Sequence, residues 1–203
     1  LGRVGSGKST LLKLAIGLFQ PTSGAVLIDG IDLRQLDPSD LRSQVGYVPQ
    51  DVMLFYGSLR DNLTLSHPQA SDAAIVRSID IANLAEFVNR HPQGFDMMIG
   101  ERGDSLSGGQ RKSVALARGV IGEPSLLLMD EPTGSMDHST EAAVQKQLLE
   151  FIKGRSWLVV THRNSLLEMV DRIIVIDNGK LVADGPRESV VEALQQGRIG
   201  KSK

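Results

Sequence analysis

The chain contains no cysteine among its 203 residues. This absence excludes disulfide bonds and metal sites built from thiolates, and it suits a reducing compartment. No apolar run approaches the roughly 18 residues that a membrane-spanning helix needs, and no signal peptide is evident. We therefore expect any action at a membrane to go through a partner or through a segment outside this sequence.

The chain also lacks a large excess of charge of either sign. The formal net charge is −2 with basic and acidic residues interspersed, so no basic footprint for nucleic acid is present. The basic end, residues 201–203, is expected to be a solvated tail and not a binding arm. With 41% hydrophobic residues, the chain is expected to fold as a single domain over residues 1–203 with a sizeable core.

A glycine-rich stretch at residues 2–10 carries the first chemical signal, because it fits the phosphate-binding pattern Gly-x-x-x-x-Gly-Lys-[Ser/Thr]. In such a loop the N–H groups of small residues point into one concavity and bind anions. Lys8 would place a positive charge on the outer phosphates, and the Ser9 hydroxyl is placed to ligate Mg²⁺. The residues expected to bind the nucleotide here are Gly2, Gly5, Ser6, Gly7, Lys8, Ser9 and Thr10.

Apolar residues with helical spacing follow this loop, from Leu11 to Leu18. They predict a helix whose N-terminal dipole adds to anion binding. The alternative is an ordinary glycine-rich turn that caps a helix. The pattern normally follows a β-strand, whereas only Leu1 precedes it and no initiator methionine is present. We therefore expect a fragment of a longer protein, incomplete at its N-terminus.

Further along, strand and helix patterns alternate. The expected strands cover residues 25–28, 45–50, 125–130 and 157–161, with a hairpin of 173–176 and 180–183. The expected helices cover 38–42, 59–65, 72–82, 84–90, 108–120, 139–153 and 187–196. The apolar runs before Glu131 and His162 are typical of parallel strands buried on both faces.

These patterns predict an α/β fold, a P-loop NTPase (RecA-like) core with a mainly parallel sheet, an inserted α-helical subdomain and a small β portion. We expect the core lobe to comprise residues 1–55 and 123–203. The helical lobe is expected at 56–122.

Two adjacent carboxylates, Asp130 and Glu131, end one of the apolar strands. Beside a phosphate loop, Asp130 suits coordination of Mg²⁺ and Glu131 suits polarising the attacking water. The alternative is a strand end that simply meets solvent. The neighbouring phosphate loop favours the catalytic interpretation.

The stretch Leu106–Gln110 offers a second anion site, with a hydroxyl and two glycine amides at a helix N-terminus. A capped helix without further function is the alternative. One nucleotide does not need two such sites in a single chain, since they occupy different lobes. We therefore expect two copies to pair head to tail, each lending this stretch to the γ-phosphate bound by the other.

Together these motifs resemble the nucleotide-binding domain of ATP-binding-cassette (ABC) transporters, in the family's order and across essentially the whole chain. The resemblance implies binding of ATP and Mg²⁺ and identifies Asp137 in the D-loop and His162 as the switch histidine. It implies catalytic roles for Glu131, His162, Gln50 and Lys8, and Mg²⁺ ligation by Ser9, Gln50 and Asp130. The nucleotide of the partner copy would be contacted by Ser107, Gly108, Gly109, Gln110 and Asp137.

The subtype resembles exporters. Residues 100–103 are similar to the X-loop that exporters use to contact the transmembrane domain, and 54–62 also look exporter-like. With 130–137, they are most similar to the ATPases of bacterial type I secretion systems, which export toxins and adhesins. This implies a transmembrane partner contacted through residues 56–103, and a place on the cytoplasmic face of a bacterial inner membrane.

Departures from the family leave alternatives open. The aromatic residue that stacks on adenine and the strand before the phosphate loop would both precede this sequence, so the fragment could fold yet bind nucleotide poorly and be inactive. A soluble ABC ATPase that acts on DNA or ribosomes would need a coiled-coil insertion or a basic face, and neither is seen. A kinase or GTPase is disfavoured, because residues 106–110 and the helical insertion have no role in those classes of enzyme.

Overall fold

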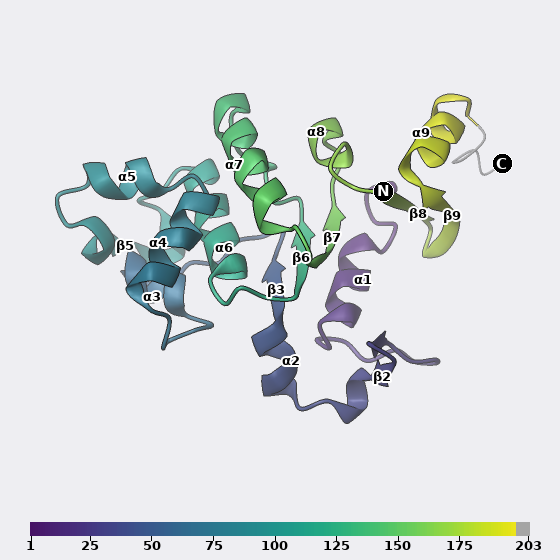
Figure 1. Ribbon diagram of the computed structural model, residues 1–203, viewed down its shortest axis with the longest axis horizontal. Helices are drawn as coiled ribbons and strands as arrows, with labels where there is room; N and C mark the ends of the chain where they lie inside the picture. Colours follow the sequence, from purple (N-terminus) through teal and green to yellow (C-terminus); the bar gives the residue numbers. More distant parts are fainter. Residues whose placement is uncertain (198–203) are drawn as a thin grey trace. The chain divides into compact units, whose positions relative to one another are not determined.

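The computed structural model describes residues 1–197, and Figure 1 shows its elements. The expected tail at 201–203 lies outside the described residues. The chain divides into two compact units, one formed by Leu1–Val26 with the residues from Val160 onward, and the other by Leu27–Val159. Among residues 1–197, no helix is both long and apolar enough to cross a membrane.

A three-stranded sheet lies at the centre of the Leu27–Val159 unit. Its strands are β3 (Val45–Val48), β6 (Leu126–Asp130) and β7 (Ser156–Val160), in the order β3-β6-β7. Strands β3 and β6 are parallel, with Val48 opposite Met129, and Leu127 to Asp130 are all buried. Helix α7 (His138–Phe151) connects β6 to β7. The strands predicted at 45–50, 125–130 and 157–161 are thereby confirmed, and the first of them ends at Val48, before Pro49.

Helix α6 (Gly108–Val120) packs against β3. The side chains of residues 112–117 are all buried, so this part of the helix is enclosed by the rest of the unit. A glycine on each partner permits the close approach: a β-carbon on Gly119 would lie 2.7 Å from Val48 Cγ2. The predicted helix at 108–120 is confirmed.

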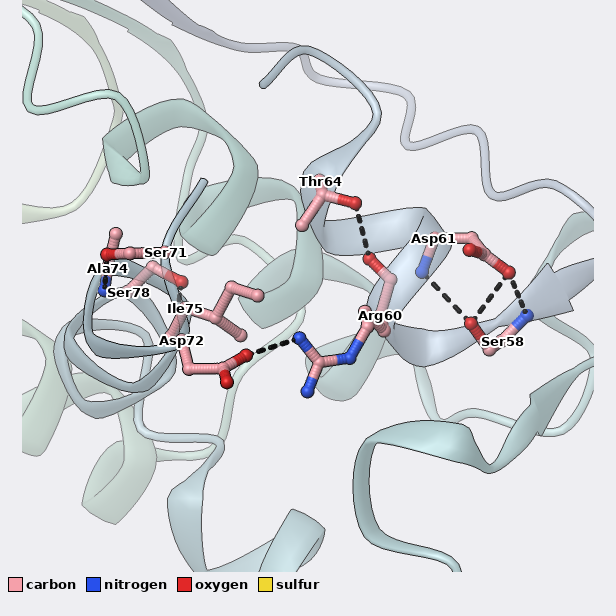
Figure 2. Close-up of polar contacts among 9 residues, drawn as sticks. All are labelled: Ser58, Arg60, Asp61, Thr64, Ser71, Asp72, Ala74, Ile75 and Ser78. Atoms are coloured by element: carbon pink, nitrogen blue, oxygen red, sulfur yellow. Dashed lines mark hydrogen bonds and ion pairs between the residues drawn. The ribbon is translucent and has the colours of Figure 1, made fainter. Parts of the chain in front are cut away.

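Between β3 and α6 the chain forms α3 (Leu59–Thr64), α4 (Asp72–Ile81) and α5 (Ala85–Arg90), with short 3-10 turns η2 (Gly94–Asp96) and η3 (Glu101–Gly103). The three predicted helices are confirmed. Figure 2 shows the cap of α3, where Ser58 Oγ accepts from the Asp61 N–H and the Asp61 carboxylate accepts from the Ser58 N–H, each at 3.0 Å. Arg60 of α3 reaches Asp72 at the start of α4, 2.7 Å away.

Three short features of this unit were not expected. Strands β4 (Gly57–Ser58) and β5 (Met98–Ile99) pair antiparallel. The strand expected at 25–28 begins only at Leu27 (β1, Leu27–Ile28), and after a turn at Asp29 and Gly30 it pairs antiparallel with β2 (Ile31–Asp32). The third is the 3-10 turn η1 (Leu33–Gln35), which precedes α2 (Pro38–Gln44), and this helix confirms the one predicted at 38–42.

The other unit contains α1 (Lys8–Ala15), α8 (Asn164–Leu167), α9 (Arg187–Gln195) and the antiparallel pair β8 (Arg172–Asp177) and β9 (Lys180–Pro186). Its core is formed by Ile173, Val175 and Val190. The hairpin turns where predicted, at Asn178 and Gly179, and both have positive φ as a two-residue I′ turn requires.

The first helix ends earlier than expected. Its predicted pattern continued to Leu18, but α1 stops at Ala15. Gly17 takes a left-handed conformation with φ 71°, and the Leu18 N–H bonds back to the Lys13 oxygen at 2.9 Å. This is a glycine helix stop, which overrides the apolar spacing.

Candidate functional site

The loop of residues 2–7 is built by glycines that no other residue could replace without strain. Gly2 has φ 145°, and a β-carbon there would come within 2.0 Å of the Ile176 oxygen on β8. Gly5 and Gly7 have φ 78° and 98° with open space around them. Such left-handed turns direct successive N–H groups to one side, which is the geometry of an anion-binding nest.

Main-chain hydrogen bonds hold this loop against the β8–β9 hairpin of the same unit. The Leu1 amine donates to the Ile174 oxygen at 2.7 Å, and the Ile176 N–H donates to the Leu1 oxygen at 2.9 Å. This is the bonding pattern of a parallel strand pair. The Gly179 N–H also donates to the Ser6 oxygen at 3.1 Å, so both ends of the loop are fixed.

Lys8 brings a positive charge to the loop and is only 9% exposed. Its Nζ donates to the oxygens of Gly2 and Arg3 at 2.8 and 2.6 Å, which holds the ammonium across the loop. Helix α1 begins at Lys8, so its N-terminal dipole adds to the positive potential. Ser9, in the first turn of α1, carries a hydroxyl oxygen of the kind that Mg²⁺ accepts.

In the other unit, Asp130 is the last residue of β6 and Gln50 follows the neighbouring strand β3 by two residues. Because β3 and β6 are parallel and Val48 is opposite Met129, both residues fall at the carboxyl edge of the sheet. Asp130 is 2% exposed, whereas Gln50 is exposed. Amide and carboxylate oxygens are hard ligands, so the pair fits Mg²⁺ chemically.

Glu131, directly after β6, has a strained backbone. Its φ is 46°, in the left-handed region that non-glycine residues adopt at a cost of roughly 1 kcal/mol. Strain of this kind is concentrated at functional sites, where it fixes the direction of a side chain. The backbone of Glu131 therefore supports its candidacy as a catalytic group.

The sequence did not single out Lys112, which the structure places beside Gln50. Its Nζ donates to the oxygens of Pro49 and Gln50 at 3.2 and 2.5 Å, and the residue is 7% exposed. Burial lowers the pKa of Lys112, while the negative charges of Asp130, Asp51 and Glu131 act in the opposite direction. The signal available in the sequence was a charged residue at the start of an otherwise apolar helix face.

Ser107 caps α6. Its Oγ accepts from the Gln110 N–H at 3.2 Å, and Gln110 Oε1 accepts from the Ser107 N–H at 2.8 Å. The side chain of Gln110 is therefore engaged within its own helix. Ser107 is exposed, and Gly109 is half-buried against Ser135, whose oxygen would lie 3.3 Å from a β-carbon at position 109.

Asp137 is the cap of α7. Its Oδ1 accepts from the N–H groups of Ser139 and Thr140, both at 3.0 Å. The Ser139 hydroxyl also donates to Oδ1, and the Thr140 hydroxyl donates to Oδ2. These bonds, that of the Ser139 hydroxyl first, hold the pKa of Asp137 below its usual range. A structural role for Asp137 is thus evident beside the expected one.

The expected site residues are distributed over both units. Lys8, Ser9 and His162 belong to the first unit, and His162 is exposed two residues after β7. Gln50, Asp130, Glu131, Asp137 and residues 107–110 belong to the second. Within residues 1–197 no cluster of three or more His, Cys, Asp or Glu side chains could hold a metal ion.

Comparisons with known proteins identify the family of this chain. The profile described as ABC transporter matches residues 1–134. The chain is 42% identical over 192 residues to the multidrug efflux ATP-binding/permease protein of Mycobacterium bovis, covering 95% of the chain and 16% of that protein. It is 39% identical over 191 residues to the alpha-hemolysin translocation ATP-binding protein HlyB of Escherichia coli, covering 94% of the chain and 27% of that protein.

Among solved structures, a bacterial Atm1-family ABC exporter with ATP bound matches with a TM-score of 0.91 and 34% identity, over 97% of this chain and 36% of that chain. The expected α/β P-loop fold is confirmed by these matches. The chain spans about a third or less of the length of these relatives.

Proposed function

The chain belongs to the ABC transporter family, and from this premise we propose that it is the ATP-hydrolysing motor domain of an exporter. The observation that carries the proposal is the presence in one chain of two glycine-lined helix N-termini, at residues 2–8 and 107–109. Each suits an anion, and they lie in different units. A head-to-tail pair of copies would use both on one triphosphate.

In this proposal the loop of residues 2–7 and Lys8 bind the phosphates of ATP. Ser9, Gln50 and Asp130 would hold Mg²⁺, and the bound cation would supply positive charge that neutralises the phosphate oxygens. Glu131 orients a water molecule and accepts its proton as the water oxygen bonds to the γ-phosphorus and ADP leaves. His162 stabilises the γ-phosphate and the position of the water.

The second copy would close the site. Ser107, Gly108 and Gly109 supply a hydroxyl and main-chain amides to the γ-phosphate held by the partner copy, while Gln110 keeps Ser107 in place through the capping box. The D-loop residue Asp137 lies at the same interface. Two ATP molecules are then enclosed by each pair, and hydrolysis allows the pair to open.

A transmembrane domain is the proposed recipient of this motion, through residues 56–103. Several large apolar side chains in and beside this range are exposed: Phe55 (52%), Tyr56 (74%) and Met98 (50%). The exposed Glu101 and Arg102 lie on η3, where Arg102 has φ 55°. Phe55 and Tyr56 are adjacent in the chain, and exposed apolar side chains that lie together favour a partner surface. The motor would act at the cytoplasmic face of the membrane and would not bind nucleic acid. Its core lobe would comprise residues 1–55 and 123–203, and its helical lobe residues 56–122.

Type I protein secretion is the class of export that we propose. It is supported by the similarity of residues 54–62, 100–103 and 130–137 to such ATPases and by the 39% identity to the alpha-hemolysin translocation protein. The 42% identity to a multidrug efflux protein favours small-molecule export as the second candidate. The ATPase rate of the full-length protein, measured with an unfolded polypeptide and with a small apolar compound, separates the two candidates. Stimulation by the polypeptide supports protein secretion, and stimulation by the compound supports small-molecule export.

The experiment that tests the paired motor mixes two inactive variants. Lys8→Ala removes the phosphate lysine and Ser107→Arg blocks the second anion site, so each alone is expected to lack ATPase activity. A one-to-one mixture should regain up to about a quarter of the original rate, because half of the pairs are mixed and each contains one complete site. A mixture as inactive as its components would overturn the head-to-tail arrangement.

The inactive-fragment alternative is tested by binding. A fluorescent ATP analogue is titrated into this chain and into a longer chain extended upstream. Binding by both supports the motor, and binding by the longer chain alone supports the alternative.

A further inference from the structure

Lys112 lies in the interior of the Leu27–Val159 unit, 7% exposed, on the helix that Ser107 begins. Burying an ammonium group is costly unless hydrogen bonds compensate it. Here the Nζ donates to two successive main-chain oxygens, those of Pro49 and Gln50. The charge therefore holds a particular piece of backbone, the one that carries the Gln50 side chain.

The same backbone segment is fixed to α6 at a second point. Arg118 Nη1 donates to the Met53 oxygen at 2.7 Å, and its Nη2 donates to Asn62 Oδ1 at 2.6 Å. The strand that leads into the segment is held as well, because Gly46 of β3 lies against Gly119. Residues 46–53 and α6 are therefore joined on both sides of Gln50.

We infer that Lys112 is a positioning residue, which fixes Gln50 to α6, the helix capped by Ser107, through the carbonyl groups of Pro49 and Gln50. A displacement of Ser107 by a bound phosphate is then passed along α6 to Gln50, at the strand edge shared with Asp130. This rests on the proposed function for its consequence in catalysis. The anchoring of Gln50 itself depends only on contacts within one unit.

Hydrogen exchange of the chain without nucleotide tests the anchoring. Lys112→Met keeps the length of the side chain and removes the donor, and should speed exchange of the amides of residues 50–53 about tenfold. Lys112→Arg, which keeps a cationic donor, should restore most of the protection. The control is Lys146→Met, at an exposed position of α7, which should leave these amides unchanged. Unaltered exchange in Lys112→Met would overturn the inference.

Steady-state ATPase assays test the coupling to catalysis. Lys112→Met should lower kcat about tenfold with KM for ATP changed less than about twofold, as expected when a group placed for the transition state is misaligned. Combining it with Gln50→Ala should give a rate no lower than that of Gln50→Ala alone, because both changes remove the same contribution. Full additivity of the two effects would contradict the inference.

Two further outcomes keep the test decisive. If Lys112→Met does not fold, Lys112→Gln replaces it and retains a neutral donor, for which an intermediate rate of exchange is expected. A chain with no ATPase activity but with faster exchange in Lys112→Met would contradict the proposed function and leave the anchoring of Gln50 supported.

Discussion

Gly46 on β3 lies so close to Gly119 on α6 that a β-carbon on Gly46 would come within 2.0 Å of the Gly119 oxygen. Neither partner is the flexible end of a side chain, so a larger residue could be accommodated only by moving the backbone. The contact fixes the distance between the strand that leads to Gln50 and the helix that begins at Ser107.

Gly46→Ala is therefore expected to lower the free energy of unfolding by about 1–3 kcal/mol, as overpacking in a close-packed interior does. Urea denaturation followed by circular dichroism measures it. Gly100→Ala is the matched control, because a β-carbon there meets no atom nearer than 4.0 Å and its φ is not positive. Equal stability of the two variants would contradict the close contact.

Leu148→Ala should be strongly destabilising. Leu148 is 0% exposed on α7, so the change removes buried methyl groups and leaves a cavity, at a cost of about 2–5 kcal/mol. Its neighbour Leu149 is 45% exposed, and Leu149→Ala should change stability by less than about 0.5 kcal/mol. The difference between the urea midpoints of the two variants tests whether α7 turns Leu148 into the core and Leu149 towards solvent.

Ser107→Ala removes the side-chain acceptor at the start of α6 and should cost about 1 kcal/mol of stability, the usual effect of losing an N-cap. Ser107→Thr keeps a hydroxyl acceptor and should retain most of that stability. Thermal unfolding of the three proteins makes the comparison. If Ser107→Ala and Ser107→Thr unfold at the same temperature, below that of the original chain, the lost stability comes from the packing around position 107 and not from the capping hydrogen bond.

Glu131→Gln should reduce ATP turnover by about 100-fold or more, the range expected for a general base, while ATP binding is preserved. The assays are steady-state hydrolysis and nucleotide titration with the full-length protein. Glu150→Gln, at an exposed position of α7, is the control and should hydrolyse ATP normally. Unchanged turnover in Glu131→Gln would refute the assignment of the base.

The stability of the chain at acid pH tests the contribution of Asp32, the N-cap of the 3-10 turn η1. The hydrogen bond from the Arg34 side chain, helped by its main-chain N–H, lowers the pKa of Asp32 to about 2. A depressed pKa stabilises the folded state fully above the unfolded pKa of about 4, and this contribution is lost as pH falls towards 2. Between pH 6 and pH 3 the urea midpoint should thus fall less in Asp32→Asn than in the original chain. Parallel curves would show that the pair contributes nothing.

Much of the fold was predictable because its signals are local. Ser58, Ser71 and Asp137 cap helices within a few residues of themselves, and Asn178–Gly179 forms its turn alone. The strands β4 and β5 have only two residues each, too few for an alternating apolar pattern, so the sequence does not predict them. The contact of Lys112 with Gln50 spans 62 residues, and only the packing of α6 on β3 determines it.

The left-handed backbone at Glu131 has a consequence for how this position tolerates change. A glycine would adopt φ 46° at ease, so the fold by itself would favour the residue that has no side chain. In the proposed mechanism the carboxylate at this position is the base, so its retention exchanges some stability for activity. A library of variants selected only for thermal stability is therefore expected to replace Glu131 with glycine, and the proposed mechanism predicts that such variants do not hydrolyse ATP.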